Sequence, residues 1–102
     1  MAEFVAVAST PEVPPGRSKV VVAAGQIIAL FNVDGRFYAM SGTCLHRGGP
    51  VGEGELDGPI VTCPWHGWQY DVRTGQNVLN PMARLTSYAV KVENGRVFVA
   101  PI

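Results

Sequence analysis

Long apolar runs are missing from this chain of 102 residues, and so is an excess of charge of either sign. The longest apolar runs, residues 20–24 and 27–31, are much shorter than the roughly 20 residues that cross a membrane as a helix. Eight basic residues balance eight acidic residues. Because phosphate binding needs clustered Lys and Arg, this balance argues against nucleic acid as a partner.

A secretion signal and a disulfide framework are also missing. The first residues, Met1 to Phe4, contain neither a basic segment nor an apolar one. We therefore expect a cytoplasmic protein without a membrane anchor. The chain has only two cysteines, and in a reducing cytoplasm such cysteines are more often thiols, metal ligands or catalytic groups than a disulfide.

Runs rich in β-branched residues are present at both ends of the sequence, and they favour strands. Two-residue turns of the Asp-Gly and Asn-Gly type join strands into hairpins. Asp34-Gly35 and Asn94-Gly95 therefore predict two hairpins. The predicted strands cover residues 4–8, 19–23, 26–33, 36–41, 88–93 and 96–100.

Helical periodicity is not sustained anywhere in the sequence. Residues 10–16, with three prolines, are predicted to be a loop, and residues 84–88 are predicted to form one helical turn at most. The fold class is therefore all-β, with an antiparallel β-sandwich or open-barrel base, in a single domain over residues 1–102. A small, loop-rich insertion at about residues 42–82 is expected to carry the function, because functional groups commonly lie on loops of a rigid scaffold.

Both cysteines and both histidines of the chain fall inside this insertion, in two pairs. Cys44 and His46 form the first pair, and Cys63 and His66 form the second after sixteen intervening residues. Two thiolates and two imidazoles suit zinc or an iron–sulfur centre. A zinc finger usually takes both cysteines from one hairpin, whereas here each loop supplies one cysteine and one histidine. That division suits two metal atoms with different ligands; the alternatives are a mononuclear zinc site, or two buried thiols beside two ordinary histidines.

The pattern Cys-x-His, sixteen residues, Cys-x2-His resembles the Rieske signature, in which two histidines replace two cysteines on one iron of a [2Fe-2S] cluster. The sequence from Cys63 to Asp71 is similar to the second cluster loop of Rieske ferredoxins and ring-hydroxylating oxygenases. The resemblance covers nearly the whole chain, and it implies the Rieske fold with one cluster-binding subdomain. It also implies the ligand set of one cluster: Cys44, His46, Cys63 and His66.

The resemblance implies a one-electron carrier and not an enzyme, because irons that are fully ligated by protein and sulfide leave no position for a substrate. The expected partners are an NAD(P)H-dependent flavoprotein reductase, which supplies electrons, and a terminal non-haem iron oxygenase, which receives them. The chain ends at Ile102 without a catalytic domain, so we expect a ferredoxin and not an oxygenase. Three alternatives stay open: the small subunit of an assimilatory nitrite reductase, a zinc-binding structural or interaction module, and a redox sensor.

Several positions differ from the Rieske proteins of cytochrome bc complexes. The extra cysteine that those proteins carry in each loop aligns with Gly49 and Trp65, and a serine that bonds to a bridging sulfide aligns with Trp68. The tyrosine position is kept as Tyr70. Because fewer hydrogen bonds to sulfur stabilise the reduced cluster less, we expect a low reduction potential of about −150 mV.

Further residues near the predicted ligands are candidates for covering the cluster or for docking a partner. Pro81 resembles the family's third loop, which covers the cluster; the alternative is a plain turn. Trp65 is expected either to dock a partner or to pack on the neighbouring cluster loop, and Trp68 is expected to pack. Arg47 either contacts an acidic partner surface or is solvated. The acidic run at 53, 55 and 57 either forms a solvated face or meets a basic reductase surface.

Overall fold

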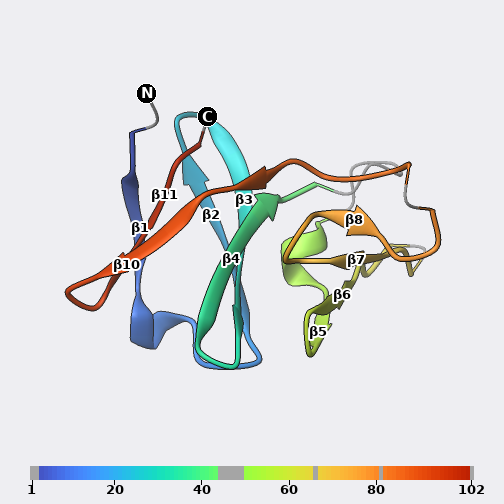
Figure 1. The fold of residues 1–102 in the computed structure, drawn as a ribbon, viewed down its shortest axis with the longest axis horizontal. Coiled ribbons are helices and arrows are strands. Elements are labelled where there is room, and N and C mark those ends of the chain that lie inside the picture. The colour runs from blue at the N-terminus through green and yellow to red at the C-terminus, as the bar shows by residue number, and fades with distance from the viewer. Residues whose placement is uncertain (1–2, 44–49, 66, 81, 102) are drawn as a thin grey trace.

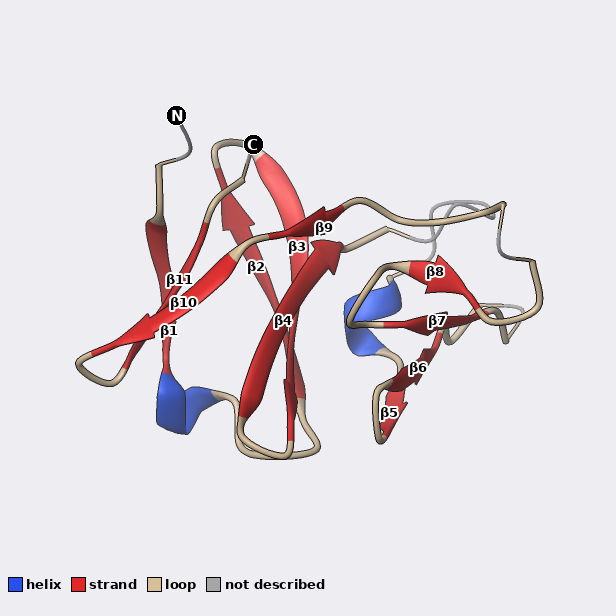
Figure 2. Cartoon of the chain, in the orientation of Figure 1, coloured by secondary structure: helices blue, strands red, loops and turns tan. Residues whose placement is uncertain are grey.

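A computed structural model describes residues 3–43, 50–65, 67–80 and 82–101 of the chain. These residues form three antiparallel sheets, two in a base and a smaller one at its side (Figure 1). Apart from strands and loops, the described residues contain two short 3-10 helices (Figure 2). The predicted all-β fold class is therefore confirmed.

The first sheet of the base has the strand order β1-β11-β10. Its strands are β1 (Val5–Ser9), β10 (Val90–Glu93) and β11 (Arg96–Val99). Asn94 and Gly95 make the predicted turn between β10 and β11, with φ angles of 53° and 74°. Asparagine and glycine tolerate this left-handed conformation better than other residues, which explains why the hairpin turns here.

The second sheet of the base has the strand order β2-β3-β4-β9. Its strands are β2 (Ser18–Ala23), β3 (Gln26–Val33), β4 (Arg36–Ser41) and β9 (Ser87–Tyr88). Asp34 and Gly35 form the predicted turn between β3 and β4, again with positive φ angles. Residues 42–86, between β4 and β9, contain the third sheet.

Strand β3 is central because it carries buried apolar side chains on both faces, and successive residues of a strand point to opposite faces. Ile28 and Leu30 are fully buried in the core between the two sheets of the base, where they join Val97 of β11. Ala29 and Phe31 are fully buried on the other face, in a second core. This second core joins the base to the third sheet.

The third sheet is small, with the strand order β5-β6-β7-β8. Its strands are β5 (Glu55–Asp57), β6 (Ile60–Thr62), β7 (Gln69–Asp71) and β8 (Gln76–Asn77). The 3-10 helix η2 (Val51–Glu53) precedes it and lies against β2, where the Ser18 hydroxyl donates a hydrogen bond to the Gly52 carbonyl at 2.9 Å. The sequence predicts this region as loop-rich but does not predict its strands, because two or three residues are too few to show an alternating pattern.

Two local predictions were wrong. Residues 10–12, predicted as loop, form the 3-10 helix η1 (Thr10–Glu12), because Ser9 donates from its backbone and its hydroxyl to the Glu12 carboxylate at 2.8 and 2.9 Å. Residues 84–88, predicted to form one helical turn at most, contain no helical turn, and Arg84 forms an isolated bridge with Gln76. The predicted strand 88–93 is divided at Ala89, so that β9 and β10 belong to different sheets. The described residues contain no helix with the length and apolar character of a membrane span.

Candidate functional site

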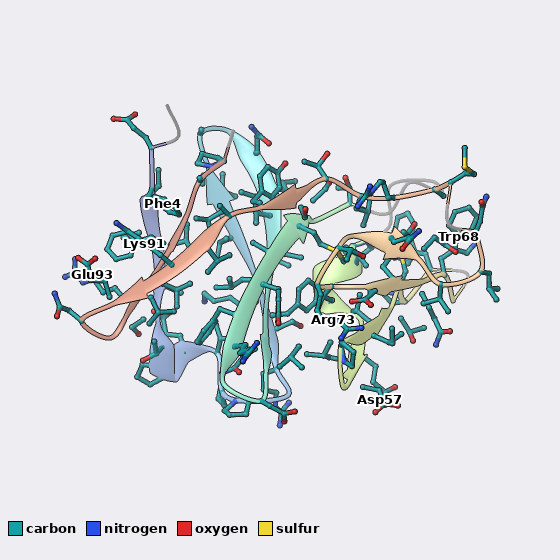
Figure 3. All side chains as sticks on the ribbon, viewed as in Figure 1. Phe4, Asp57, Trp68, Arg73, Lys91 and Glu93 are labelled. Atoms are coloured by element: carbon teal, nitrogen blue, oxygen red, sulfur yellow. The ribbon has the colours of Figure 1, made fainter. Side chains whose placement is uncertain are left out.

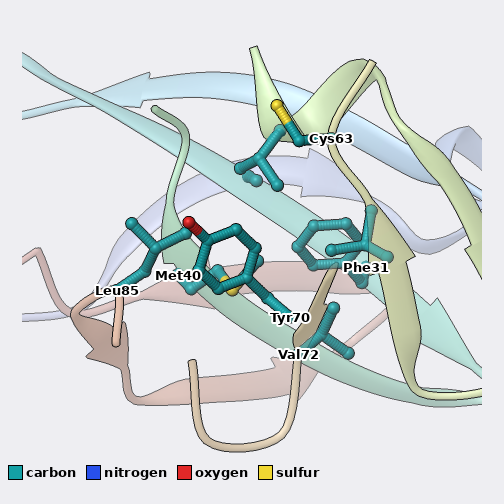
Figure 4. Packing of buried hydrophobic residues seen from close by; sticks show 9 residues of the cluster. Phe31, Met40, Cys63, Tyr70, Val72 and Leu85 are labelled. Carbon is teal, nitrogen blue, oxygen red and sulfur yellow. The ribbon is translucent and has the colours of Figure 1, made fainter. Parts of the chain in front are cut away.

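Cys63 follows β6 directly, and its side chain is fully buried. It belongs to the second core, whose members include Phe31 and Tyr70. In Figure 4 its sulfur lies at the edge of this core and points away from the Tyr70 and Phe31 rings. The thiol is therefore shielded from solvent, and it points away from the aromatic rings of the second core.

The loop that follows Cys63 is a closed turn. The Cys63 N–H donates to the Trp68 carbonyl at 2.7 Å, which ties the two ends of the loop together. Gly67 has a φ angle of 71°, a conformation that a side chain would strain. The predicted ligand His66 lies in this loop but outside the described residues.

The loop that carries the first predicted pair is closed in a similar way. An isolated antiparallel bridge joins Thr43 to Pro50 at its two ends. Val51, the next residue, is fully buried in the same core as Cys63. The two loops therefore start from one core, although they are distant in sequence. Cys44, His46 and Arg47 lie outside the described residues, so the ligand role of the first pair stays a prediction.

The chemistry of the donor set fits a [2Fe-2S] cluster with mixed ligands. The four candidate ligands are two thiols and two imidazoles, divided equally between two loops that share a base. A buried thiol such as Cys63 suits a metal centre that must be kept from water, since the shell around a site controls solvent access. The described part of the site is consistent with Cys63 as a cluster ligand.

A third segment, residues 77–83, lies next to the second loop. Asn77, only 7% exposed, ends β8, and its Oδ1 atom accepts hydrogen bonds from the N–H groups of Leu79 at 2.9 Å and Asn80 at 3.0 Å. The Asn77 N–H in turn donates to the Ala83 carbonyl at 2.9 Å. These bonds fix the backbone of residues 77–80 and join it to Ala83.

This turn is also attached to the rest of the small sheet. The Val78 N–H donates to the Gln69 carbonyl of β7 at 3.0 Å, and the Asn80 carbonyl accepts from the Ala83 N–H at 3.0 Å. The Asn80 side chain accepts from the Met82 N–H at 3.1 Å. Pro81, predicted to belong to a loop that covers the cluster, lies outside the described residues.

Asn77 is a functional candidate that sequence reasoning missed. An asparagine side chain often accepts hydrogen bonds from backbone groups two or three residues further on. The spacing of Asn77 and Asn80, together with the proline that follows, was a signal for such a turn. What the sequence could not show is that Asn77 is buried, because its burial depends on packing between separate segments.

The aromatic residues of the second loop and of β7 differ in exposure. Trp65 is 49% exposed, whereas Tyr70 is fully buried in the second core. Trp68 is partly buried and packs against that core. Of the three side chains, only Trp65 is largely exposed at the surface.

The turn after β7 is stabilised by an ion pair. The Arg73 guanidinium donates to both carboxylate oxygens of Asp71, from Nε at 3.0 Å and from Nη2 at 2.7 Å. These hydrogen bonds hold the pKa of the Asp71 carboxyl below its usual range and raise the pKa of Arg73. The Leu85 N–H donates to the Gly75 carbonyl at 2.7 Å, which links this turn to the segment that returns to the base.

The acidic residues of the predicted run lie on or beside the small sheet. Glu55 and Asp57 are exposed on β5 and line a shallow hollow with Gln69 of β7. Glu53 ends the helix η2 and is also exposed. The hollow faces solvent, so these carboxylates are accessible to a partner.

Comparison with known proteins supports one family. Residues 3–89 match the family model of the Rieske [2Fe-2S] domain. The biphenyl dioxygenase ferredoxin subunit of Pseudomonas sp. (strain KKS102) is 38% identical over 98 residues, which cover 94% of this chain and 90% of that protein.

Solved structures agree with this match. A chain in a complex of reduced oxygenase and oxidized ferredoxin in carbazole 1,9a-dioxygenase is 33% identical, with a TM-score of 0.87, and covers 95% of this chain and 92% of that one. The ferredoxin of carbazole 1,9a-dioxygenase from Nocardioides aromaticivorans IC177 is 26% identical, with a TM-score of 0.92, and covers 99% of this chain and 100% of that one. Among the alternatives that the sequence leaves open, these relatives support a ferredoxin component.

Proposed function

Because the chain belongs to the Rieske [2Fe-2S] domain family, we propose that it carries single electrons to a terminal non-haem iron oxygenase. Its cofactor is one [2Fe-2S] cluster, which accepts and releases one electron when it is bound. The chain is an electron-transfer component and not itself a catalyst. Its similarity to ferredoxin components of dioxygenase systems supports this assignment.

The observation that carries the proposal is the common base of the two cluster loops. Cys63 and Val51 belong to one core, and each loop is closed at its ends by backbone pairing. Such anchoring holds the ends of both loops at fixed places. The fold itself therefore positions these loop ends, and a cluster bound between the loops adds to an arrangement that already exists. Cys44 and Cys63 would supply thiolates to one iron, and His46 and His66 would supply imidazoles to the other.

The chain's own residues also separate the site from water. Cys63 is fully buried, Tyr70 fills the core beneath it, and Trp68 packs on that core. Exclusion of water keeps the local dielectric constant low, which affects the stability of the reduced state. The base and the insertion at about 42–82 thus have different tasks: the base provides rigidity, and the insertion holds the cluster.

The source of electrons in this proposal is an NAD(P)H-dependent flavoprotein reductase, and the chain works in the cytoplasm. The names of the relatives refer to oxygenase systems with a separate ferredoxin component. A separate carrier needs a reductase as well as an oxygenase, because NADH gives up electrons in pairs as hydride whereas the cluster accepts one.

The proposal can be tested with the terminal oxygenase of a carbazole 1,9a-dioxygenase system. The chain is reduced with dithionite without oxygen, freed of dithionite, and mixed with the oxygenase, carbazole and oxygen. We expect carbazole to be consumed in proportion to the reduced chain supplied. If the ferredoxin of that system supports carbazole oxidation and the reduced chain does not, the proposed partner is wrong.

A further inference from the structure

The edge strands of the three sheets in the described part of the chain are β1, β10, β2, β9, β5 and β8. A free strand edge presents unpaired N–H and C=O groups, so proteins commonly protect it by short length, irregularity or charge. β8 and β9 have two residues each, and the pairing of β1 shifts register between Ala6 and Ala8. β5 and β10 carry charged side chains, among them Asp57, Lys91 and Glu93 (Figure 3). Each of these five edges is therefore protected against pairing with another chain.

The remaining edge strand, β2, has none of these protections (Figure 1). It has six residues without proline, Ser18–Ala23, and it pairs with β3 in unbroken register. Lys19 is its only charged residue, and the Lys19 ammonium is paired with the Glu12 carboxylate at 3.5 Å. The edge of β2 is therefore long, regular and nearly uncharged.

Exposed apolar side chains accompany this edge. Val20 is 39% exposed, Val22 is 67% exposed, and Ile27, which lies opposite Val22 on β3, is 50% exposed. Alternate residues of a strand share a face, and so do residues paired directly across two strands. The three side chains therefore form one apolar patch. The helix η2 covers only the start of the strand, where Gly52 lies against Val20.

The pairing with β3 shows which backbone groups of β2 face outward. In an antiparallel pair alternate residues bond to the partner strand, and the residues between them direct their N–H and C=O groups to the other side. The Arg17 carbonyl accepts from the Asn32 N–H at 3.0 Å, so the alternate residues that follow Arg17 bond to β3. The N–H and C=O groups of Val20 and Val22 therefore point to the free edge.

We propose that β2 pairs with β2 of a second copy of this chain, antiparallel and around a twofold axis. The register that fits places Val20 opposite Val22 of the second copy, and each such pair exchanges two backbone hydrogen bonds. The valines of both copies then form one apolar row, with Ile27 of each copy beside it. In this register Lys19 lies opposite Ala23 of the second copy, so that no like charges oppose each other.

Two features favour a second copy over a different protein as the occupant. A twofold contact brings the same surface of both subunits together, and this edge is complementary to itself in shape, polarity and charge. The chain also has zero formal net charge, so two copies do not repel each other at long range. The contact is smaller than that of a stable complex, and we expect a weak dimer with a Kd of roughly 10–100 µM.

The first test is sedimentation velocity of the cluster-loaded chain at increasing concentration, with Val22→Lys and Val92→Lys as variants. Val92 is 49% exposed on β10, so Val92→Lys adds the same charge at a similarly exposed valine of another strand. Val22→Lys places two lysines, one from each copy, inside the apolar row. We expect Kd of the dimer to rise at least about tenfold for Val22→Lys and to stay unchanged for Val92→Lys.

The second test removes the outward N–H group of Val22. Proline lacks this group and is tolerated in an edge strand where the missing N–H faces outward. Threonine keeps both the N–H and a β-branched shape, so Val22→Thr is the matched control. We expect Val22→Pro to abolish the dimer and Val22→Thr to weaken it at most severalfold. Circular dichroism and iron content identify a variant that has not folded or loaded, and such a variant is left out.

The third test needs no variant, because it follows hydrogen exchange of the wild-type chain at low and high concentration. The outward amides of Val20 and Val22 should exchange more slowly at high concentration, because pairing with a second copy protects them. Exchange in residues 96–99 should stay unchanged, since β11 is the central strand of its sheet.

Each contrary result overturns the inference. The inference is wrong if the wild-type chain stays monomeric at all concentrations, or if residues 18–23 exchange at the same rate at both. A dimer that forms equally well with Val22→Lys and Val22→Pro uses another surface. If Val92→Lys dissociates the dimer as strongly as Val22→Lys does, the effect is one of charge alone. None of these measurements depends on electron transfer, so the proposed function stands or fails separately.

Discussion

Replacement of Asn77 by alanine should loosen the third segment of the site without disturbing the base. The Asn77 side chain accepts two backbone hydrogen bonds, at 2.9 and 3.0 Å, and is 7% exposed. A typical hydrogen bond contributes about 1 kcal/mol to stability. Water can reach the freed N–H groups of Leu79 and Asn80, because both residues are exposed. We therefore expect Asn77→Ala to lower the free energy of unfolding by about 1–2 kcal/mol.

Thermal unfolding followed by circular dichroism measures this effect, with fully loaded protein and a fixed heating rate. For a domain of this size, 1 kcal/mol corresponds to a change in Tm of roughly 4–8 °C. Asn80→Ala is the control, because the Asn80 side chain accepts one backbone hydrogen bond, at 3.1 Å, and is exposed. Asn80→Ala should therefore lower Tm less than Asn77→Ala does. Asn77→Asp keeps an oxygen that accepts the hydrogen bonds, so its Tm should lie between those of wild type and Asn77→Ala.

An Asn77→Ala variant whose Tm equals that of Asn80→Ala or of wild type would contradict this expectation. In that case the two hydrogen bonds would contribute nothing beyond what water supplies. Protease sensitivity provides a local check: cleavage within residues 77–83 should increase in Asn77→Ala, while cleavage elsewhere stays unchanged, because only this turn depends on the Asn77 side chain.

Four other results are expected. Cys63→Ser should lose most of its iron and sulfide, since the thiolate is a predicted ligand; a full-strength cluster in this variant would reject the assignment. Leu85→Ala, at a site only 2% exposed in the second core, should lower stability by about 2–5 kcal/mol in urea unfolding, and a loss under about 0.5 kcal/mol would show that the core is not tightly packed there. Because Arg73 lowers the pKa of Asp71 in the folded state, the stability that Asp71 contributes is complete above the unfolded pKa of about 4 and is lost as the pH falls through the lower folded pKa. Asp71→Asn should remove this part of the loss of stability at acid pH, as measured by Tm against pH. A profile of Tm against pH that equals that of wild type would contradict this role of Asp71. A redox titration should give a midpoint near about −150 mV, and a midpoint well above zero would contradict the reasoning from missing hydrogen-bond donors.

The strands of the base could be predicted because their signals are local. Asp34-Gly35 and Asn94-Gly95 set the hairpin turns by their tolerance of positive φ angles, and β-branched runs flank both. The break at Ala89, which divides the predicted strand 88–93 into β9 and β10, could not be predicted. It depends on the pairing of each strand with a different sheet, which the local sequence does not show. The strands of the small sheet were too short for an alternating pattern to appear.

The candidate ligands were predicted from their spacing in the sequence, and their ligand roles stay a prediction. The structure shows only that one of them, Cys63, is buried at the base of a closed loop. The burial of Asn77 and the exposure of Leu79 could not be predicted from spacing. An apolar residue in a sequence gives no sign of whether it is buried or exposed, and Leu79 resembles a core residue until the turn around it is known.

The most direct measurement is iron and acid-labile sulfide analysis of the purified protein, together with its visible and electron paramagnetic resonance spectra before and after dithionite. We expect about two irons and two sulfides for each chain, a coloured protein that bleaches on reduction, and a signal from one unpaired electron in the reduced state. A colourless protein that contains zinc and shows no change with dithionite would contradict the proposal that this chain carries electrons.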